Sequence, residues 1–222
     1  MKKIIDLSHV IEEGMLTFIA PWHPMVEISI MGRHGLEGRE TRKIVFGTHT
    51  GTHIDAPAHF VPGGSTIDET SLDALVGKAF LVRFPQCLPK RKINIRDVKK
   101  QLPDLSKVKR VIFRFDWSRF WGQEQFYKDW PFFSLELASW LIEGGVTLVG
   151  MDTPSPDNPM DDRASGNDSP LHKLFLKNGV TLVEYLARLD EVKTDSFDLV
   201  ALPLKIKQGD GSPSRVIALV NE

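Results

Sequence analysis

The twelve residues 49–60 constrain this chain more than any other segment, because they concentrate side chains that bind metal ions. They read His-Thr-Gly-Thr-His-Ile-Asp-Ala-Pro-Ala-His-Phe and hold three of the seven histidines of the chain. Histidine and carboxylate are ligands that zinc, manganese and iron accept readily. Even numbers of residues separate His49, His53, Asp55 and His59, so an extended backbone directs all four side chains to one face. Surface hydrogen bonding by a histidine pair is the alternative, but it does not account for four such side chains in register.

The backbone of this segment cannot be one straight strand that serves one ion. Gly51 and Pro57 disfavour a helix there. At roughly 3.3 Å per residue, His53 and Asp55 lie about 7 Å apart along a strand, which allows one ion to be shared. His49 and His53 would lie about 13 Å apart, farther than two ligands at about 2 Å from one ion can reach. We therefore predict a bend near Gly51, which glycine permits, or a different ion for His49.

The rest of the chain predicts strands that alternate with helices. Strands are expected over residues 3–7, 26–31, 41–46, 79–84, 108–115, 146–151, 197–206 and 215–220, helices over 71–76 (closed by Gly77), 94–102, 134–143 and 169–176, and a strand that turns into a short helix over 180–189. Alternation in 3–7 and 26–31 indicates one buried face in each. Strand, helix and strand in succession imply at least one parallel βαβ unit, so we predict an α/β fold with a mixed sheet.

Composition limits the class of protein. The 222 residues show no break in composition and are expected to form one domain, 1–222. Lys and Arg total 28 against 29 Asp and Glu, so charge gives no reason to expect a nucleic acid or a membrane as partner. Cys87, the only cysteine, is expected to be a small buried residue. No apolar run follows the first lysines and no span reaches the length of a membrane helix, which predicts a cytoplasmic protein.

Three segments are candidates for ligand contact. The loop 14–24 carries Phe18 and Trp22, which either bind a ligand or anchor the loop to the core. The segment 116–133 has the highest concentration of aromatic residues and is either a wall for a ring-bearing substrate or core packing under a long loop. The proline-rich loop 151–159 follows a buried strand, where α/β proteins bind ligands.

The segment 49–60 resembles the signature of the cyclase family of metal-dependent hydrolases, which includes kynurenine formamidase and isatin hydrolase. The likeness continues in residues 5–8 (Ile-Asp-Leu-Ser), 149–155, 201–205 and 210–215. It implies a swivelling β/β/α domain, with a mixed central sheet or barrel-like β core flanked by helices. It also implies a homodimer or homotetramer in which loops of a neighbouring subunit help to close the site.

The resemblance also assigns roles to single residues. It implies a divalent metal cofactor, zinc or alternatively manganese, with one or two ions per subunit. The metal ligands correspond to His49, His53, Asp55, His172 and Glu184, with Asp55 able to bridge two ions. His59 corresponds to the general acid/base. Formamidases carry Trp-Pro-Gly-Asp in the first loop, where the tryptophan stacks on an aryl substrate; here Phe18 takes that position, and Trp22 is a displaced alternative.

The activity implied by the resemblance is hydrolysis of a C–N amide bond in a small substrate. N-formylkynurenine, an intermediate of tryptophan catabolism, is one candidate. Ring opening of a lactam or imide, as in isatin hydrolase, is the second hypothesis, and a metal-stabilised binding protein without turnover is the third. His59 beside the ligands argues against the third hypothesis, because a purely structural metal site tends to be closed and needs no base.

Overall fold

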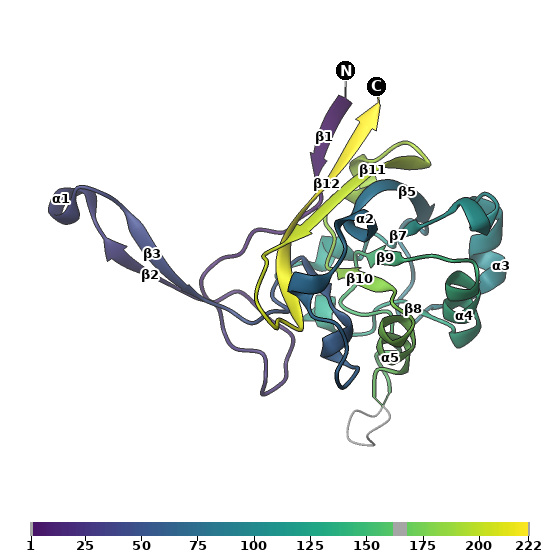
Figure 1. The fold of residues 1–222 in the computed structure, drawn as a ribbon, viewed down its shortest axis with the longest axis horizontal. Helices are drawn as coiled ribbons and strands as arrows, with labels where there is room; N and C mark the ends of the chain where they lie inside the picture. Colours follow the sequence, from purple (N-terminus) through teal and green to yellow (C-terminus); the bar gives the residue numbers. More distant parts are fainter. Residues whose placement is uncertain (1, 162–167, 222) are drawn as a thin grey trace.

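The centre of the molecule is a closed sheet. The computed structural model describes residues 2–161 and 168–221 (Figure 1). Around the ring of seven strands the order is β12 (Gly211–Asn221), β11 (Ser196–Pro203), β5 (Val76–Arg83), β7 (Arg110–Arg114), β9 (Leu148–Met151), β10 (Thr181–Glu184) and β4 (His53–Asp55). β4 pairs with β12 and closes the ring, and β1 (Lys2–Asp6) adds to the other end of β12. This confirms the predicted barrel-like β core in a mixed sheet.

Four of these strands, β5, β7, β9 and β10, are parallel neighbours. Each of the three connections between them contains a helix: α3 (Ile95–Val98), α4 (Leu135–Glu143) and α5 (Pro170–Lys177). α4 packs against both α3 and α5 on the outside of the sheet (Figure 1). The parallel βαβ arrangement predicted from the element order is therefore confirmed.

The ends of the helices follow from local chemistry. The Ser134 hydroxyl accepts a hydrogen bond from the Leu137 N–H and caps α4, which ends at Gly144 as predicted. The predicted helix 94–102 is shorter: α3 ends at Val98 and a 3-10 helix follows. Gly77 does not close the preceding helix, α2 (Leu72–Leu75), because that helix runs directly into β5.

Short elements complete the description. The 3-10 helices among the described residues are Pro57–His59, Ile67–Glu69, Lys99–Gln101, Leu105–Lys107, Trp117–Phe120, Glu124–Tyr127 and Leu189–Glu191. β6 (Lys92–Ile93) pairs in parallel with β8 (Phe132–Phe133). None of the helices within the described ranges has the length and apolar character needed to cross a lipid bilayer.

Side-chain alternation along the strands divides the core in two. Ile54, Leu81, Ile112 and Val183, from four strands of the ring, belong to one cluster, inside the ring. Their neighbours on the opposite faces, such as Val82 and Phe113, pack in a second cluster with α4 and α5. Both faces of the parallel strands are therefore buried, which explains their continuous apolar sequences.

Most of the aromatic segment 116–133 belongs to this outer core. Trp117 and Phe126 are fully buried, and the Trp117 indole donates a hydrogen bond to the Phe126 carbonyl. The core-packing alternative therefore holds for these two residues. Trp130 is also buried but borders the cavity described below. Cys87 is buried as expected.

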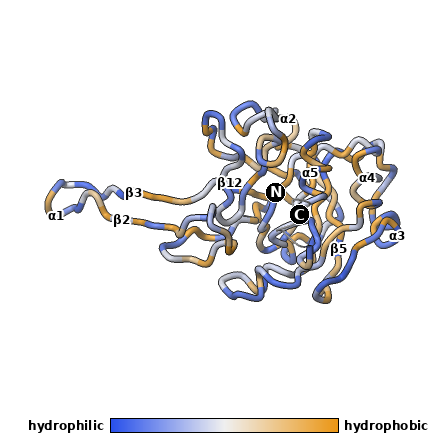
Figure 2. Tube along the Cα trace, turned by 90° about the horizontal axis from the view of Figure 1, so that it is seen from below, coloured by the Kyte–Doolittle hydropathy of each residue, from blue (hydrophilic) through white to orange (hydrophobic). Residues whose placement is uncertain are grey.

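A hairpin projects from the barrel on one side. It consists of β2 (Glu27–Gly32), β3 (Thr41–Val45) and a short helix, α1 (His34–Glu37), near its tip (Figure 1). The prediction of one buried face over 26–31 is wrong beyond its first residues, because Ile30 and Met31 are exposed. The reason is that the hairpin extends away from the barrel, so neither of its faces meets the core; Figure 2 shows hydrophobic residues along it.

Candidate metal centre

The predicted bend in the histidine segment is present. Gly51 has φ +61°, a left-handed conformation that glycine adopts without steric cost. The extended conformation is confined to β4, since His49 lies in the turn before it and His59 ends the 3-10 helix that begins at Pro57. Gly51 and Pro57 thus fix a turn on each side of β4, and the segment is not one extended strand.

β4 lies between β10 and β12, and this position assembles the site. His53 faces Glu184 across the β10 pair, and Asp55 faces Gly211 across the β12 pair. A Cβ atom at Gly211 would lie 2.7 Å from His49 Cε1 and 2.9 Å from the Ile54 carbonyl oxygen. Glycine at this position therefore leaves room for the His49 ring.

The five residues predicted as ligands come together in space. Asp55 Oδ1 lies 2.7 Å from His49 Nδ1 and 3.3 Å from His53 Nε2, while its Oδ2 lies 3.4 Å from His172 Nε2. Glu184 is arranged in the same way, with Oε2 at 3.5 Å from His53 Nε2 and Oε1 at 3.1 Å from His172 Nε2. Each carboxylate thus presents one oxygen to His53 and the other to His172.

These residues fit a divalent cation. Asp55 Oδ2 and Glu184 Oε1 are buried and accept no hydrogen bond from the residues that the structure describes. Burial of carboxylate oxygens without such partners is costly unless a charge or a metal ion compensates them. Ligand atoms of His53, Asp55 and Glu184 all lie within 4.8 Å of one another, as do those of His49, Asp55 and His59. Imidazole and carboxylate donors of this kind suit zinc or manganese.

The second ring nitrogen of each histidine predicted as a ligand has an acceptor. The pairs are His49 Nε2 with Asp210 Oδ2 at 2.9 Å, His53 Nδ1 with the Gly51 carbonyl at 2.8 Å, and His172 Nδ1 with Asp157 Oδ2 at 2.5 Å. Such acceptors are typical of metal-binding histidines, because they fix the ring orientation and the nitrogen that carries the proton. The arrangement leaves His49 Nδ1, His53 Nε2 and His172 Nε2 directed at the paired carboxylates.

Asp157 and Asp210 were not predicted as site residues. Asp157 lies in the loop after β9 that was expected to bind ligands, and it also accepts the backbone N–H groups of Leu171 and His172. Asp210 directly precedes β12 in the sequence. Asp210 lies in the family-like segment 210–215 and Asp157 in the proline-rich loop 151–159, but neither segment indicates a histidine partner. Each aspartate is close to its histidine only through the pairing of distant elements.

Buried charge shifts the proton affinities of the metal-free site. Burial opposes protonation of His49, but the adjacent Asp55 carboxylate and two hydrogen bonds outweigh it and raise the pKa to about 10. Burial also opposes protonation of His172, but interactions with its neighbours, chiefly the negative charge of Glu184, outweigh it and raise the pKa of His172. Burial raises the pKa of Glu184. The site therefore holds protons that a metal ion displaces on binding.

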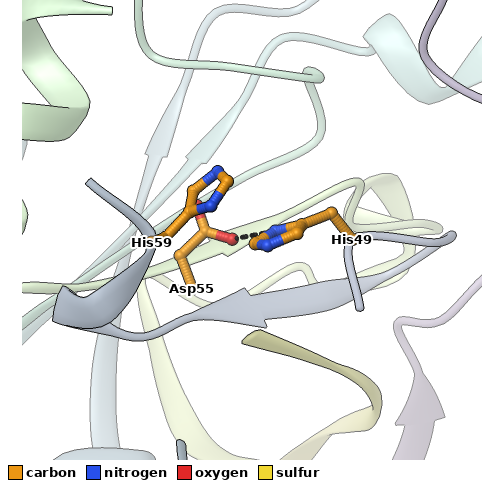
Figure 3. A group of neighbouring side chains, drawn as sticks. All are labelled: His49, Asp55 and His59. Carbon is orange, nitrogen blue, oxygen red and sulfur yellow. Dashed lines mark hydrogen bonds and ion pairs between the residues drawn. The ribbon is translucent and has the colours of Figure 1, made fainter. Parts of the chain in front are cut away.

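His59 stands beside the ligands. Its ring stacks on that of His49, with centroids 3.8 Å apart and planes inclined by 28°. Its Nδ1 atom lies 3.4 Å from Asp210 Oδ2. Figure 3 shows His49, Asp55 and His59 converging from the turn, the strand and the 3-10 helix. Hydrogen bonds with His49 and His59 hold the pKa of Asp210 far below its usual range.

The metal centre opens into a cavity of about 410 Å³. Its aromatic lining residues are Phe18, Trp22, Phe60, Trp130 and Tyr185. Phe18 packs edge-on against Trp130, with ring centroids 6.3 Å apart, whereas 72% of Trp22 is exposed. Both of the predicted substrate-contact alternatives therefore line the cavity, Phe18 as part of its packed wall and Trp22 at its solvent side.

Comparison with known proteins points to one family. Residues 5–158 match the family model described as "Putative cyclase". Kynurenine formamidase of Bacillus cytotoxicus is 33% identical over 176 residues, which cover 79% of this chain and 78% of the relative. The kynurenine formamidase of Erythrobacter litoralis is also 33% identical, over 79% of this chain and 74% of its own length.

Solved structures agree with this result. Isatin hydrolase A from Labrenzia aggregata, bound to benzyl benzoate, superposes with a TM-score of 0.88 and 25% identity, covering 100% of this chain and 94% of that one. A structure described as a potential metal-dependent hydrolase with cyclase activity gives a TM-score of 0.76 and 28% identity over 100% of both chains. The family model covers well over half of the sequence, and the formamidases exceed 30% identity over most of it, so this chain belongs to the cyclase family.

Proposed function

We propose that this protein is a metal-dependent hydrolase that cleaves the C–N bond of a small amide. The observation that carries the proposal is the pair of buried carboxylates, Asp55 and Glu184, each with one oxygen toward His53 and one toward His172, at the base of an open cavity. A purely structural metal site is closed, whereas a catalytic site keeps a position open to water and substrate. The family relatives are named as hydrolases.

The donor set supports two ions per subunit, zinc or alternatively manganese. His49, His53 and Asp55 would hold the first ion, and His172 the second, with Asp55 and Glu184 shared between them. The opposite orientation of the two oxygens in each carboxylate supports sharing. When bound, such ions lower the pKa of a coordinated water from 15.7 to about 7 and polarise a carbonyl group.

The side chains around this centre supply the proton transfers. His59 Nδ1 faces Asp210, so Nε2 is the atom that takes the proton from the attacking water. The water oxygen forms a bond to the carbonyl carbon, and the C–N bond then breaks. His59 returns the proton to the leaving nitrogen, so that a carboxylic acid and an amine form without a further reactant.

The cavity walls support a flat, ring-bearing substrate. Phe18, Phe60 and Trp130 present aromatic surface beside the metal centre, and aromatic rings stack favourably on one another. An aryl formamide such as N-formylkynurenine, which would place the protein in tryptophan catabolism, is the leading substrate because the curated relatives are kynurenine formamidases. A lactam or imide that opens on hydrolysis is the second candidate, since isatin hydrolase A matches the whole chain in structure.

One substrate panel tests the proposal. Protein loaded with zinc or manganese is offered N-formylkynurenine, isatin and simple cyclic imides, before and after chelation. We expect turnover of at least one substrate that chelation abolishes and added metal restores. Full metal loading without turnover of any of them would favour the third hypothesis, a metal-stabilised binding protein.

A further inference from the structure

We propose that Asp210 is a positioning residue that fixes the tautomers of two imidazoles at once, those of His49 and His59. A single oxygen, Oδ2, lies 2.9 Å from His49 Nε2 and 3.4 Å from His59 Nδ1. The other oxygen accepts a hydrogen bond from the Thr48 hydroxyl at 2.8 Å, which orients the carboxylate. The proposal rests on the proposed function, since it concerns the residues that would bind the ion and move the proton.

His49 and His59 need a lone pair on different ring nitrogens. A neutral imidazole carries one hydrogen, and its position decides which nitrogen has a lone pair. His49 Nδ1 faces Asp55 Oδ1 at 2.7 Å and is the nitrogen directed at the ion, so its hydrogen belongs on Nε2. His59 requires a lone pair on Nε2 to accept a proton, so its hydrogen belongs on Nδ1. Asp210 Oδ2 accepts a hydrogen bond from His49 Nε2 and lies 3.4 Å from His59 Nδ1, so it faces both of the required positions.

Ring stacking explains why one carboxylate reaches both rings. The His49 and His59 centroids are 3.8 Å apart, so the edges that face Asp210 lie side by side. The backbone holds Asp210 in place, because its carbonyl accepts a hydrogen bond from the Ala56 N–H at 2.9 Å. Asp210 is thereby fixed to the same segment that carries the two histidines.

Asp157 provides a matched comparison within the same site. It accepts from His172 Nδ1 and makes no hydrogen bond to His59 among those of the described residues. Asp157→Asn therefore weakens the pair of Asp157 with His172 but removes no hydrogen bond of His59 within the described part of the chain. Asp210→Asn weakens the pairs of both His49 and His59, because an amide has one acceptor oxygen and its nitrogen cannot accept.

The test combines nitrogen NMR with kinetics on the zinc-loaded full chain. Long-range ¹H–¹⁵N spectra distinguish imidazole tautomers, and seven histidines are few enough to assign by substitution. In Asp210→Asn we expect His59 to change from the single Nδ1–H form to a mixture, and kcat at full zinc occupancy to fall about 10- to 100-fold with KM nearly unchanged. Asp157→Asn should lower zinc affinity while the His59 signals stay as in the wild type.

Several outcomes overturn the proposal. His59 signals that do not change in zinc-loaded Asp210→Asn would contradict it. A rise in KM with kcat unchanged would also contradict it, because that result would identify Asp210 as a substrate contact. If Asp210→Asn does not fold, Thr48→Val takes its place, because it removes the hydroxyl that orients the carboxylate and should shift the same His59 signals less. The NMR measurement needs no turnover, so it decides the role of Asp210 even if no amide proves to be a substrate.

Discussion

His59 differs from the histidines predicted as ligands in how its ring is enclosed. The side chains of His53 and His172 are 2% and 7% exposed. Every ring nitrogen of these two histidines faces a carboxylate or a backbone carbonyl. The His59 side chain is 21% exposed and lines the cavity. A ring nitrogen open to the cavity suits proton exchange with water and substrate, whereas buried rings suit metal binding.

Substitution of His59 separates these two roles. His59→Ala should keep its metal content near that of the wild type and lose activity by roughly 10²- to 10⁴-fold, the usual contribution of a general acid/base. Elemental analysis and turnover on the best substrate of the panel measure both quantities. Loss of metal would instead identify His59 as a ligand. This outcome is worth testing because the ligand atoms of His49, Asp55 and His59 lie close enough together to hold an ion.

Metal stoichiometry tests His172 and Glu184, the two predicted ligands from distant elements. His172→Ala should remove the second ion, and Glu184→Ala should lower binding of both, since its oxygens face His53 and His172. Glu191→Ala is a matched control, because this glutamate pairs with Arg188 in a surface ion pair. A metal content equal to that of the control would show that neither residue binds the ion.

Prediction of the elements succeeded where local chemistry decides the structure. Residues 134–143 form a helix as expected, because Ser134 and Gly144 mark its ends. The buried face expected for 26–31 is wrong, because alternation alone does not reveal whether a layer lies against the strand. His172 and Glu184 entered the site only through the family resemblance, since they meet β4 through α5 and β10. Asp157 and Asp210 were missed for the same reason.

The loop after β1 introduces a pH dependence of stability. His9 stacks on Trp121, with centroids 4.0 Å apart, and burial lowers its pKa to about 4 from the ordinary value of 6.5. Between pH 6.5 and 4 the unfolded chain therefore binds a proton at this residue and the folded chain does not. The free energy of unfolding should fall as the pH is lowered through this window, by at most about 3 kcal/mol from this residue.

Replacement of His9 by a residue that does not titrate isolates this effect. His9→Phe keeps a ring against Trp121 and should lose less stability than the wild type between pH 6.5 and 4. Urea unfolding of the metal-free proteins at several pH values measures the difference without a contribution from metal loss. Parallel profiles for the two proteins would show that His9 is not the group responsible.

On the scale of the whole molecule, the hairpin of β2 and β3 stands out because its apolar side chains do not pack into the hydrophobic core. Ile28 and Ile44 are paired across its strands, and Ile30 lies on the same face. A two-stranded ribbon is marginally stable in water on its own. Exposed apolar side chains on such a ribbon are typical of a subunit contact, which supports the expectation of a homodimer or homotetramer.

Charge placed on this face should disrupt the assembly. The double substitution Ile30→Asp with Ile44→Asp should yield monomers in light scattering at micromolar concentration, because buried carboxylates oppose association. Lys43→Asp, on the opposite face of β3, is the control and should keep the assembly of the wild type. A wild-type protein that is itself monomeric under these conditions would contradict the expectation.

Closure of the ring by β12 also determines when the metal centre forms during biosynthesis. The ribosome completes His49, His53 and Asp55 more than 150 residues before it reaches Gly211, the β12 residue opposite Asp55. Contacts between segments so distant in sequence form slowly, because closing the long loop between them costs entropy. A nascent chain therefore displays the first residues predicted as ligands before the strand and the carboxylate that orient them have been made, so we expect metal capture to wait for the synthesis of β12.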